Sequence, residues 1–271
     1  MKYSPQVVKA LEWLHKAQHD SGGFAANMTK SGHQGTPYPE VTGYLIPTLF
    51  KYDLRDKALR AAEFLIRIQH KNGAVHGAPL DDTPRTLHVF DTAMVAAGLL
   101  AAYQETLDEV YLDGYSRAIT WVRDHLPIDI QTPLYQVKAA AVIGIVLEMW
   151  RELALMPEFL TEHSYRSHYV AYMLEGFRTL NIDMTPLLSK LDGLARPFPF
   201  FFGGQSSSNS TCIVGNFQLS ILLGDQSLFE MMEGWQRSDG GFTSSVDDTE
   251  RLLWTLCYYL EAAYAFGAHT K

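Results

Sequence analysis

One pattern decides the fold and occurs three times: ALEWLHKAQHDSGGF at residues 10–24, AAEFLIRIQHKNGAV at residues 61–75, and LFEMMEGWQRSDGGF at residues 228–242. Each copy reads as an amphipathic helix that ends at a glutamine (Gln18, Gln69 or Gln236), with glycine four residues later. Glycine just beyond the last periodic residue indicates a helix end and a tight turn. A unit that recurs in this way indicates a repeat architecture.

A second, more apolar helix follows each turn, and an acidic residue opens it. These helices are PEVTGYLIPTLF with Glu40, FDTAMVAAGLLAAY with Asp91, and DDTERLLWTLCYYL with Asp248. The distance from the glutamine to the acid is 22 residues in the first two copies and 12 in the third. We therefore expect Glu40 and Asp91 to occupy equivalent positions in their repeats.

The same two-helix rhythm continues between the second and third copies. Apolar helices that open on a polar residue are expected at six places, near Glu40, Asp91, Tyr135, His168, Thr211 and Asp248, each after an amphipathic partner such as a short helix near residues 157–162. Helices that are apolar on most faces are buried, so they should form an inner ring with the amphipathic helices outside. The prediction is an all-α (α/α)6 toroid of six helix pairs, built as a single domain over residues 1–271, in which all the inner helices begin at one mouth of the barrel.

Composition and motifs exclude several classes of function. A formal charge of −8 argues against nucleic acid as a partner, and 47% hydrophobic content excludes a disordered chain. No apolar run reaches 18 residues and the N-terminus lacks a signal sequence, so we expect a cytoplasmic protein without a membrane span. Cys212 and Cys257 should be buried free thiols, and without CxxC or HExxH spacing we expect neither a metal nor another cofactor. The oligomeric state stays open.

The repeats resemble those of the prenyltransferase and squalene-cyclase toroids in their Q-x-x-x-G-G-F turns and their DDT and FDT helix starts. They are also similar to toroid proteins of bacterial polysaccharide biosynthesis clusters, through YPEVTGYLIPTL, VFDTAMVAAGLL, SHYVAYMLEGF and CIVGNFQLSIL. This resemblance covers nearly the whole chain. Related toroids include uronate epimerases, polysaccharide lyases and hydrolases, so it implies a terpenoid cyclase/glycosidase-like fold. It also implies a carbohydrate-active enzyme that acts on a glycan or sugar intermediate of a bacterial surface polysaccharide.

Convergence of the inner helix starts would gather the candidate site residues. The catalytic candidates are Glu40, Asp91, Asp248, Asp247, Tyr38 and His168; the substrate-binding candidates are Tyr44, Tyr135, Lys138, Tyr172, Asn209, Asn216 and Arg251. Carboxyl groups that share a cavity repel each other when ionised, so at least one pKa should rise while another acid stays ionised. Two carboxyl groups in different protonation states suit acid–base chemistry on a glycosidic bond, as in a hydrolase.

Other interpretations of these residues remain open. In a lyase or epimerase, Tyr38, Tyr135 or His168 would carry the proton while Lys138, Arg251 or Asn209 neutralises a substrate carboxylate. The segment SVDDTERLLW resembles the general-acid motif of class II terpene cyclases, in which Asp247 matches the protonating acid and Ser245 replaces the first acid. Each first-turn acid could also be a helix cap, and the toroid could bind a glycan or a protein without catalysis.

Overall fold

The structure is a computed structural model that describes residues 2–126, 134–145, 165–192, 197–202, 210–267 and 269–270. This part of the chain contains eleven helices: α1 (Pro5–Ala17), α2 (Pro39–Lys51), α3 (Arg55–Ile68), α4 (Val89–Thr106), α5 (Glu109–His125), α6 (Gln136–Val142), α9 (Ser167–Thr179), α10 (Thr185–Asp192), α11 (Ile213–Leu223), α12 (Gln226–Glu233) and α13 (Leu253–Ala265). It also contains six strands of two residues each: β1 (Lys2–Tyr3), β2 (Asn27–Met28), β3 (Tyr165–Arg166), β4 (Phe201–Phe202), β5 (Arg251–Leu252) and β6 (His269–Thr270).

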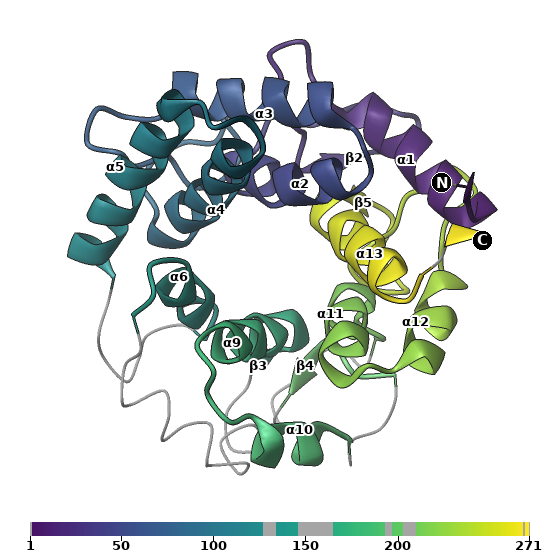
Figure 1. Ribbon diagram of the computed structural model, residues 1–271. Helices are drawn as coiled ribbons and strands as arrows, with labels where there is room; N and C mark the ends of the chain where they lie inside the picture. Colours follow the sequence, from purple (N-terminus) through teal and green to yellow (C-terminus); the bar gives the residue numbers. More distant parts are fainter. Residues whose placement is uncertain are drawn as a thin grey trace.

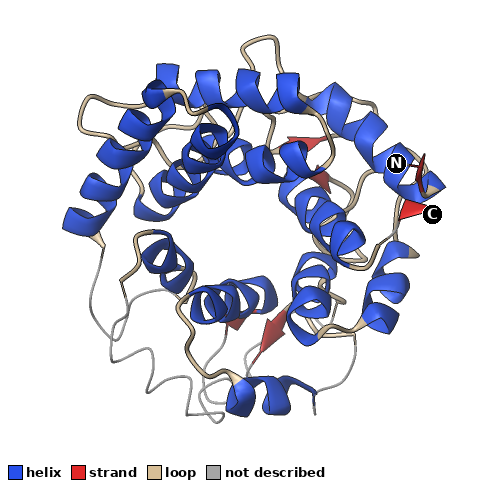
Figure 2. Cartoon of the chain, in the orientation of Figure 1, coloured by secondary structure: helices blue, strands red, loops and turns tan. Residues whose placement is uncertain are grey.

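The helices form two concentric rings (Figures 1 and 2). Helices α2, α4, α6, α9, α11 and α13 form the inner ring, and the described outer helices are α1, α3, α5, α10 and α12. Each inner helix packs against the next, and α13 packs against α2, so the inner ring is closed. The predicted all-α toroid is confirmed. The outer helix expected near residues 157–162 lies outside the described residues.

Residue pattern explains which helices lie inside. The inner helix α4 buries residues on almost every face, whereas the outer helix α3 buries only Ala58, Ala61, Ala62, Phe64 and Leu65 along one stripe. Helices that are apolar all round lose their unfavourable contact with water only when they are covered on every side. None of the described helices combines the length and apolarity that a membrane crossing requires.

The repeated glutamines join neighbouring outer helices. The Gln69 amide donates to the carbonyl oxygens of Gly73, four residues on, and of Gly114 in α5, each at 2.9 Å. Gln18 and Gln236 make the same pair of bonds, to the glycine of their own turn and to the next outer helix. Gly73 has a φ of +94°, a left-handed conformation that glycine adopts without strain. The pattern that marked the repeats is therefore a clamp between consecutive outer helices.

The ring closes where the two ends of the chain meet (Figure 1). Strands β1 and β6 pair antiparallel, with Lys2 opposite Thr270. Strands β2 and β5 also pair antiparallel, with Asn27 opposite Leu252, so the first inter-helix loop is joined to the last. The pairing of β5 corrects one prediction. The last inner helix begins at Leu253 rather than near Asp248, because the backbone of Arg251 and Leu252 is held in the strand.

Helices α2 and α4 approach each other closely at two glycines. A Cβ atom on Gly43 would lie 2.5 Å from the Met94 carbonyl oxygen, and one on Gly98 would lie 2.8 Å from the Gly43 carbonyl oxygen. Only glycine leaves room for backbones at this separation, since such distances are well inside van der Waals contact. The first turns of α2 and α4, which carry Glu40 and Asp91, are thereby held side by side.

Replacing Gln69 with alanine tests the clamp. Two backbone carbonyls lose a donor, so we expect the free energy of unfolding, measured by urea denaturation, to fall by about 1–3 kcal/mol. Gln104→Ala, an exposed position near the end of α4, is the matched control and should change this free energy by less than about 0.5 kcal/mol. Equal effects of the two substitutions would contradict the clamp.

Candidate functional site

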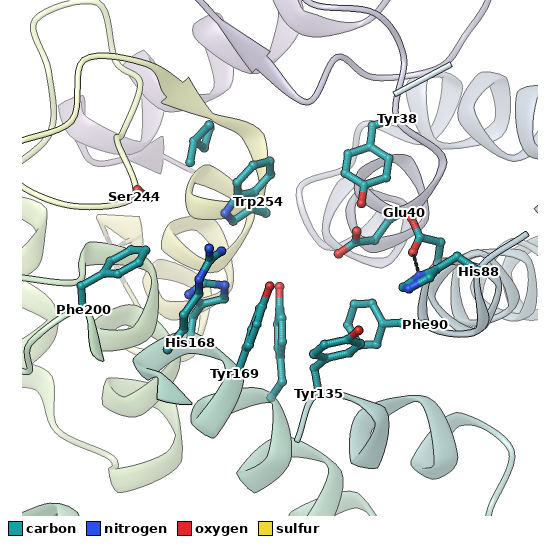
Figure 3. Close-up of a pocket in the computed structure, with 14 residues that line it drawn as sticks. Tyr38, Glu40, His88, Phe90, Tyr135, His168, Tyr169, Phe200, Ser244 and Trp254 are labelled. Carbon is teal, nitrogen blue, oxygen red and sulfur yellow. Dashed lines mark hydrogen bonds and ion pairs between the residues drawn. The ribbon is translucent and has the colours of Figure 1, made fainter. Parts of the chain in front are cut away.

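A cavity of about 320 Å³ lies at the amino-terminal ends of the inner helices α2, α4, α6, α9 and α13 (Figure 3). Its lining residues are Tyr38, Glu40, His88, Phe90, Asp91, Tyr135, Arg166, His168, Tyr169, Tyr172, Phe200, Ser244, Leu252 and Trp254. A second cavity, of about 460 Å³, is lined by residues farther along the same five helices, including Lys51, Thr179 and Glu261 near their carboxyl-terminal ends, and by Ile221 of α11. These five inner helices therefore run in one direction, and their starts meet at one mouth as expected.

Six of the sequence-predicted site residues line the mouth cavity: Tyr38, Glu40, Asp91, Tyr135, His168 and Tyr172. The two acids do not, however, occupy equivalent repeat positions. Thr42 and Thr92 do, because each hydroxyl donates to the carbonyl preceding its helix (2.8 Å and 2.7 Å) and accepts from a loop N–H (2.9 Å and 3.1 Å). Counted from these threonines, Glu40 corresponds to Phe90 and Asp91 to Val41. The equal spacing of 22 residues hides a one-residue difference in loop length.

Glu40 has the most perturbed carboxyl group of the cavity. Burial raises its pKa to about 7, and the nearby charge of Asp91 contributes to this rise. Hydrogen bonds from Tyr38 and Tyr44 and the proximity of His88 act in the opposite direction. Glu40 can therefore exchange a proton close to neutral pH, as a general acid or base must.

Asp91 is held by the residue that caps its own helix. His88 Nδ1 bonds to Asp91 Oδ2, and this bond raises the pKa of His88. The other carboxyl oxygen, Oδ1, is buried and has no hydrogen-bond partner among the described residues. Tyr38 lies within hydrogen-bonding reach of both Glu40 and Asp91, and burial together with these two acids raises the pKa of its hydroxyl. Tyr38, Glu40 and His88 lie on one wall of the cavity (Figure 3), and Asp91 joins this group through its bond to His88 and its charge beside Glu40.

The wall opposite Glu40 carries a guanidinium group, an imidazole and aromatic rings in place of carboxyl groups. His168 and Phe200 lie across the cavity from Glu40 (Figure 3), and Arg166 lines the same cavity. The guanidinium group of Arg166 lies 5.6 Å from the ring centre of Tyr169 and 5.9 Å from that of Phe200. Burial, assisted by the charge of Arg166, lowers the pKa of His168 to about 3, so this imidazole is neutral at physiological pH.

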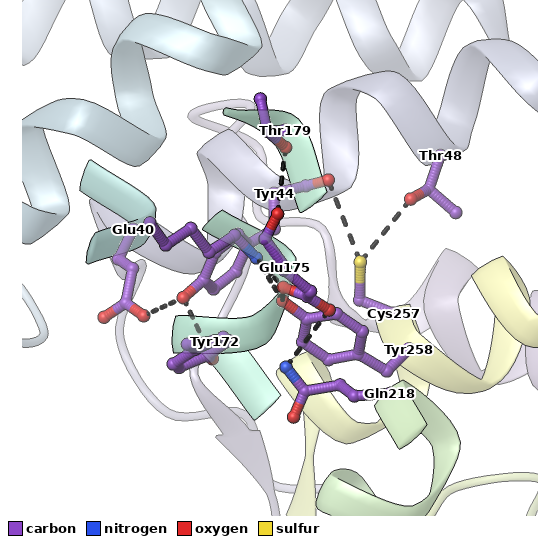
Figure 4. Close-up of polar contacts among 10 residues, drawn as sticks. Glu40, Tyr44, Thr48, Tyr172, Glu175, Thr179, Gln218, Cys257 and Tyr258 are labelled. Carbon is purple, nitrogen blue, oxygen red and sulfur yellow. Dashed lines mark hydrogen bonds and ion pairs between the residues drawn. The ribbon is translucent and has the colours of Figure 1, made fainter. Parts of the chain in front are cut away.

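A polar layer of tyrosines lies between the two cavities, because Tyr172 lines the first while Tyr44 and Tyr258 line the second. Figure 4 shows the hydrogen bonds within this layer. The Tyr44 hydroxyl donates to Glu40 Oε1 and lies 3.0 Å from the Tyr172 hydroxyl. Lys138 Nζ lies 4.7–5.1 Å from the ring centres of Tyr44, Tyr172 and Tyr258 and 2.7 Å from Glu175 Oε2. Tyr44 and Lys138 line the second cavity, not the mouth. Tyr44 and Lys138 were expected at the mouth, and this expected position is wrong. Tyr44 donates a hydrogen bond to Glu40 from the side of the second cavity, and Lys138 forms an ion pair with Glu175 within the tyrosine layer.

Three predicted residues of the last repeat lie away from the cavity. Asp247 and Asp248 are exposed in the loop before α13, where Asp248 accepts a hydrogen bond from Ser244. Arg251 is buried in β5 and bonds to the Asp239 carboxylate at 2.9 Å. The reason is the late start of α13, which leaves these residues in the loop and strand instead of in the first helical turn.

Asn216 has a structural position. It lies four residues after Cys212, the residue that caps α11, as Thr42 lies four residues after Tyr38. Its amide donates to the Cys212 carbonyl at 2.8 Å and accepts from the Phe198 N–H at 3.3 Å. Asn216 thus makes the same loop-fixing bonds as the threonines, and it does not reach the cavity. The remaining candidate, Asn209, lies outside the described residues.

Sequence reasoning missed eight residues of the cavity: His88, Phe90, Arg166, Tyr169, Phe200, Ser244, Leu252 and Trp254. A positional signal could have found three of them. The residue immediately before each of five inner helices lines the cavity, and these capping residues are Tyr38, His88, Tyr135, Arg166 and Leu252. Tyr38 and Tyr135 were among the predicted site residues, whereas His88, Arg166 and Leu252 were not, because the sequence criterion was mainly a polar residue in the first helical turn. In the described part of the chain, no group of three or more His, Cys, Asp or Glu side chains could hold a metal ion.

No protein-family model and no curated protein sequence matches this chain. Solved structures do match over almost its whole length. An alpha-amylase from Clostridium perfringens is 13% identical, with 98% of this chain and 100% of that chain covered and a TM-score of 0.70. An unsaturated glucuronyl hydrolase specific for heparin is 12% identical (97% and 95% covered, TM-score 0.64), and a type II terpene cyclase from Scytonema is 11% identical (97% and 97% covered, TM-score 0.64). At such identities the likeness shows a shared toroid fold.

Two substitutions should move the pKa of Glu40 in opposite directions. Tyr44→Phe removes a hydrogen bond to the carboxylate and should raise it, whereas Asp91→Asn removes a nearby negative charge and should lower it. The measurement is an NMR titration of the side-chain carboxyl carbon in glutamate-labelled protein. Tyr115→Phe, on the outer helix α5, is the control and should leave the titration unchanged. Shifts of the same sign in the first two variants would contradict the assignment of causes.

Proposed function

We propose that the protein is a glycan-acting hydrolase that cleaves a glycosidic bond by acid–base chemistry at the mouth of the toroid, with Glu40 as general acid. The observation that carries this proposal is the pair formed by Glu40 and Asp91. Their carboxyl groups lie on one wall of the cavity, and burial beside Asp91 raises the pKa of Glu40 to about 7. A carboxyl group that is protonated near neutral pH can donate its proton to the leaving glycosidic oxygen.

The remaining cavity residues suit a sugar. Aromatic rings from Phe90, Tyr135, Tyr169, Phe200 and Trp254 lie among polar and charged groups. Apolar ring faces with a few convergent polar groups are typical of small-ligand sites. A sugar presents both C–H faces and hydroxyl groups, and this mixed wall complements both.

Asp91 is suited to be the second carboxyl group of the reaction because His88 holds it in place. Their hydrogen bond fixes Asp91 Oδ2, while Oδ1 has no partner among the described residues. In the proposed reaction, Glu40 protonates the leaving oxygen and Asp91 stabilises the positive charge that develops on the sugar ring. Deprotonated Glu40 can then accept a proton from the water that completes hydrolysis, since a general acid in one step serves as general base in the next.

The other proton carriers are less suited to the task. The pKa of the Tyr38 hydroxyl is raised by burial and by the two acids, which opposes formation of the phenolate base that a lyase requires. The pKa of His168 is lowered to about 3, so its neutral imidazole is a weak base and has no imidazolium proton to give at neutral pH. A lyase or epimerase that uses Tyr38 or His168 is therefore less well supported than hydrolysis.

The isoprenoid cyclase and the non-catalytic toroid remain outcomes that experiment distinguishes. A cyclase that used Asp247 would need this acid above a dry aromatic pocket, but Asp247 is exposed and does not line the mouth cavity. Two of the structural neighbours are named as an alpha-amylase and a glucuronyl hydrolase, which agrees with a glycan substrate. A role in bacterial surface-polysaccharide assembly is part of the proposal and rests on the sequence resemblance alone.

The Glu40→Gln protein tests the proposal directly. Turnover of the best substrate in a panel of 4-nitrophenyl glycosides and oligosaccharides should fall by about 10²- to 10⁴-fold, because the proton donor is lost. Glu63→Gln, an exposed glutamate on α3, is the matched control and should retain full activity. Full activity of Glu40→Gln would contradict the assignment of Glu40 as general acid, and loss of glycoside turnover in Asp247→Asn alone would transfer that role to Asp247.

The same variant should reveal the cost of ionising Glu40 in the folded protein. The folded-state pKa of about 7 exceeds the ordinary value of 4.5, so ionisation disfavours the folded state progressively as pH rises from about 4.5 to 7. The difference in unfolding free energy between Glu40→Gln and the unmodified protein should therefore grow over this range by about 3 kcal/mol and then level off. Urea denaturation at several pH values measures it, and a difference independent of pH would exclude the raised pKa.

A further inference from the structure

The wall opposite Glu40 contains a cationic side chain that forms no ion pair with the described residues. Arg166, the residue that caps α9, lines the cavity and is exposed. Its guanidinium group lies over the aromatic rings of Tyr169, Phe200 and Phe201, and among the described residues no carboxylate pairs with it. An arginine that rests on aromatic faces keeps its N–H fork free for an oxyanion, which it can bind through two parallel hydrogen bonds.

A second group beside Arg166 is polar, buried and unpartnered. His168 lies in the first turn of α9, is only 8% exposed, and lines the cavity (Figure 3). Its Nδ1 atom has no hydrogen-bond partner in the described part of the chain. A buried polar atom without a partner is costly unless a ligand or water satisfies the side chain. Since the imidazole is neutral, one of its ring nitrogens carries a proton that it can donate.

The direction of the inner helices adds to this positive region. Helix α9 has 13 residues and points its amino-terminal end at the cavity, where its dipole favours negative charge although the Ser167 N–H is already bonded to the Phe200 carbonyl oxygen. Glu40 and Asp91 at the ends of α2 and α4 offset this effect on their own wall. The cavity is thus polarised, with acids on one side and the Arg166 region on the other.

We propose that Arg166, His168 and the amino-terminal end of α9 form a subsite for an anionic substituent, so that the natural substrate is an acidic glycan. The shared chemistry is an oxyanion on a sugar: a carboxylate, a sulfate or a phosphate. Repulsion from the Asp91 carboxylate keeps the anion away from the reacting side, so the sugar binds with its charged group toward Arg166 and its glycosidic oxygen toward the protonated Glu40. This inference rests on the proposed function for its orientation, but the binding preference is measurable without turnover.

Calorimetric titration with four matched probes tests the subsite. The probes are methyl β-D-glucuronide, its neutral 6-methyl ester, and the 6-sulfate and 6-phosphate of methyl β-D-glucoside. We expect at least one charged probe to bind at least about tenfold more tightly than the ester, and the best of the three identifies the oxyanion. Arg166→Met should abolish the preference while leaving ester binding within about twofold, and Arg166→Lys should keep part of it. Arg123→Met, at an exposed position on α5, should change neither.

The outcomes separate this inference from the proposed hydrolysis. Equal binding of charged and neutral probes, no binding of any charged probe, or a preference that survives Arg166→Met in a protein with unchanged thermal stability would overturn the anion subsite. A charge preference that depends on Arg166, in a protein that hydrolyses none of the glycans tested, would support the subsite and contradict the hydrolase. Hydrolysis of neutral glycans without any charge preference would support the hydrolase and contradict the anion subsite.

Discussion

The chemistry of the mouth depends on one constraint, the closeness of Glu40 and Asp91. Their helices pack backbone to backbone at Gly43 and Gly98, so the two carboxyl groups cannot move apart without separating α2 from α4. Burial and this proximity together make ionisation of Glu40 unfavourable and raise its pKa to about 7. The hydrogen bonds that limit the rise come from tyrosines of the same helix and its cap, so helix packing and proton affinity are set by the same few contacts.

The two cavities differ in how their acids are paired. In the second cavity Glu175 forms an ion pair with Lys138, and Glu261 forms one with Lys51, whereas Glu40 and Asp91 at the mouth have no lysine or arginine partner among the described residues. Lys138 is also surrounded by the rings of Tyr44, Tyr172 and Tyr258, which form the tyrosine layer between the cavities. Tyr44 belongs to this layer and also bonds to Glu40. A change in the layer is therefore transmitted to the acid through a single hydroxyl group, while the substrate side of Glu40 faces the open mouth.

Much of the fold could be predicted from the sequence because the repeat signal is physical: the glutamines clamp outer helices, and all-round apolar helices must lie inside. The site could be predicted only in part. Glu40 and Asp91 were identified from an equal spacing that conceals a one-residue difference between their loops, which only the bonds of Thr42 and Thr92 expose. Asp248 was misplaced because strand pairing with a loop more than 200 residues earlier delays the start of α13, and no local pattern indicates such a pairing. Arg166 was not predicted because its proposed role depends on its position across the cavity from Glu40 and Asp91, and the residues around it in the sequence do not indicate that position.

A crystal structure of the Glu40→Gln protein with a bound acidic oligosaccharide tests the central claim most directly, because it locates the bond and the charge together. Our account predicts one sugar unit within the mouth cavity, with a glycosidic oxygen within hydrogen-bonding distance of the residue 40 amide and the anionic group on Arg166. An oligosaccharide bound in the second cavity, on the outer surface, or with its anionic group beside Asp91 would contradict it.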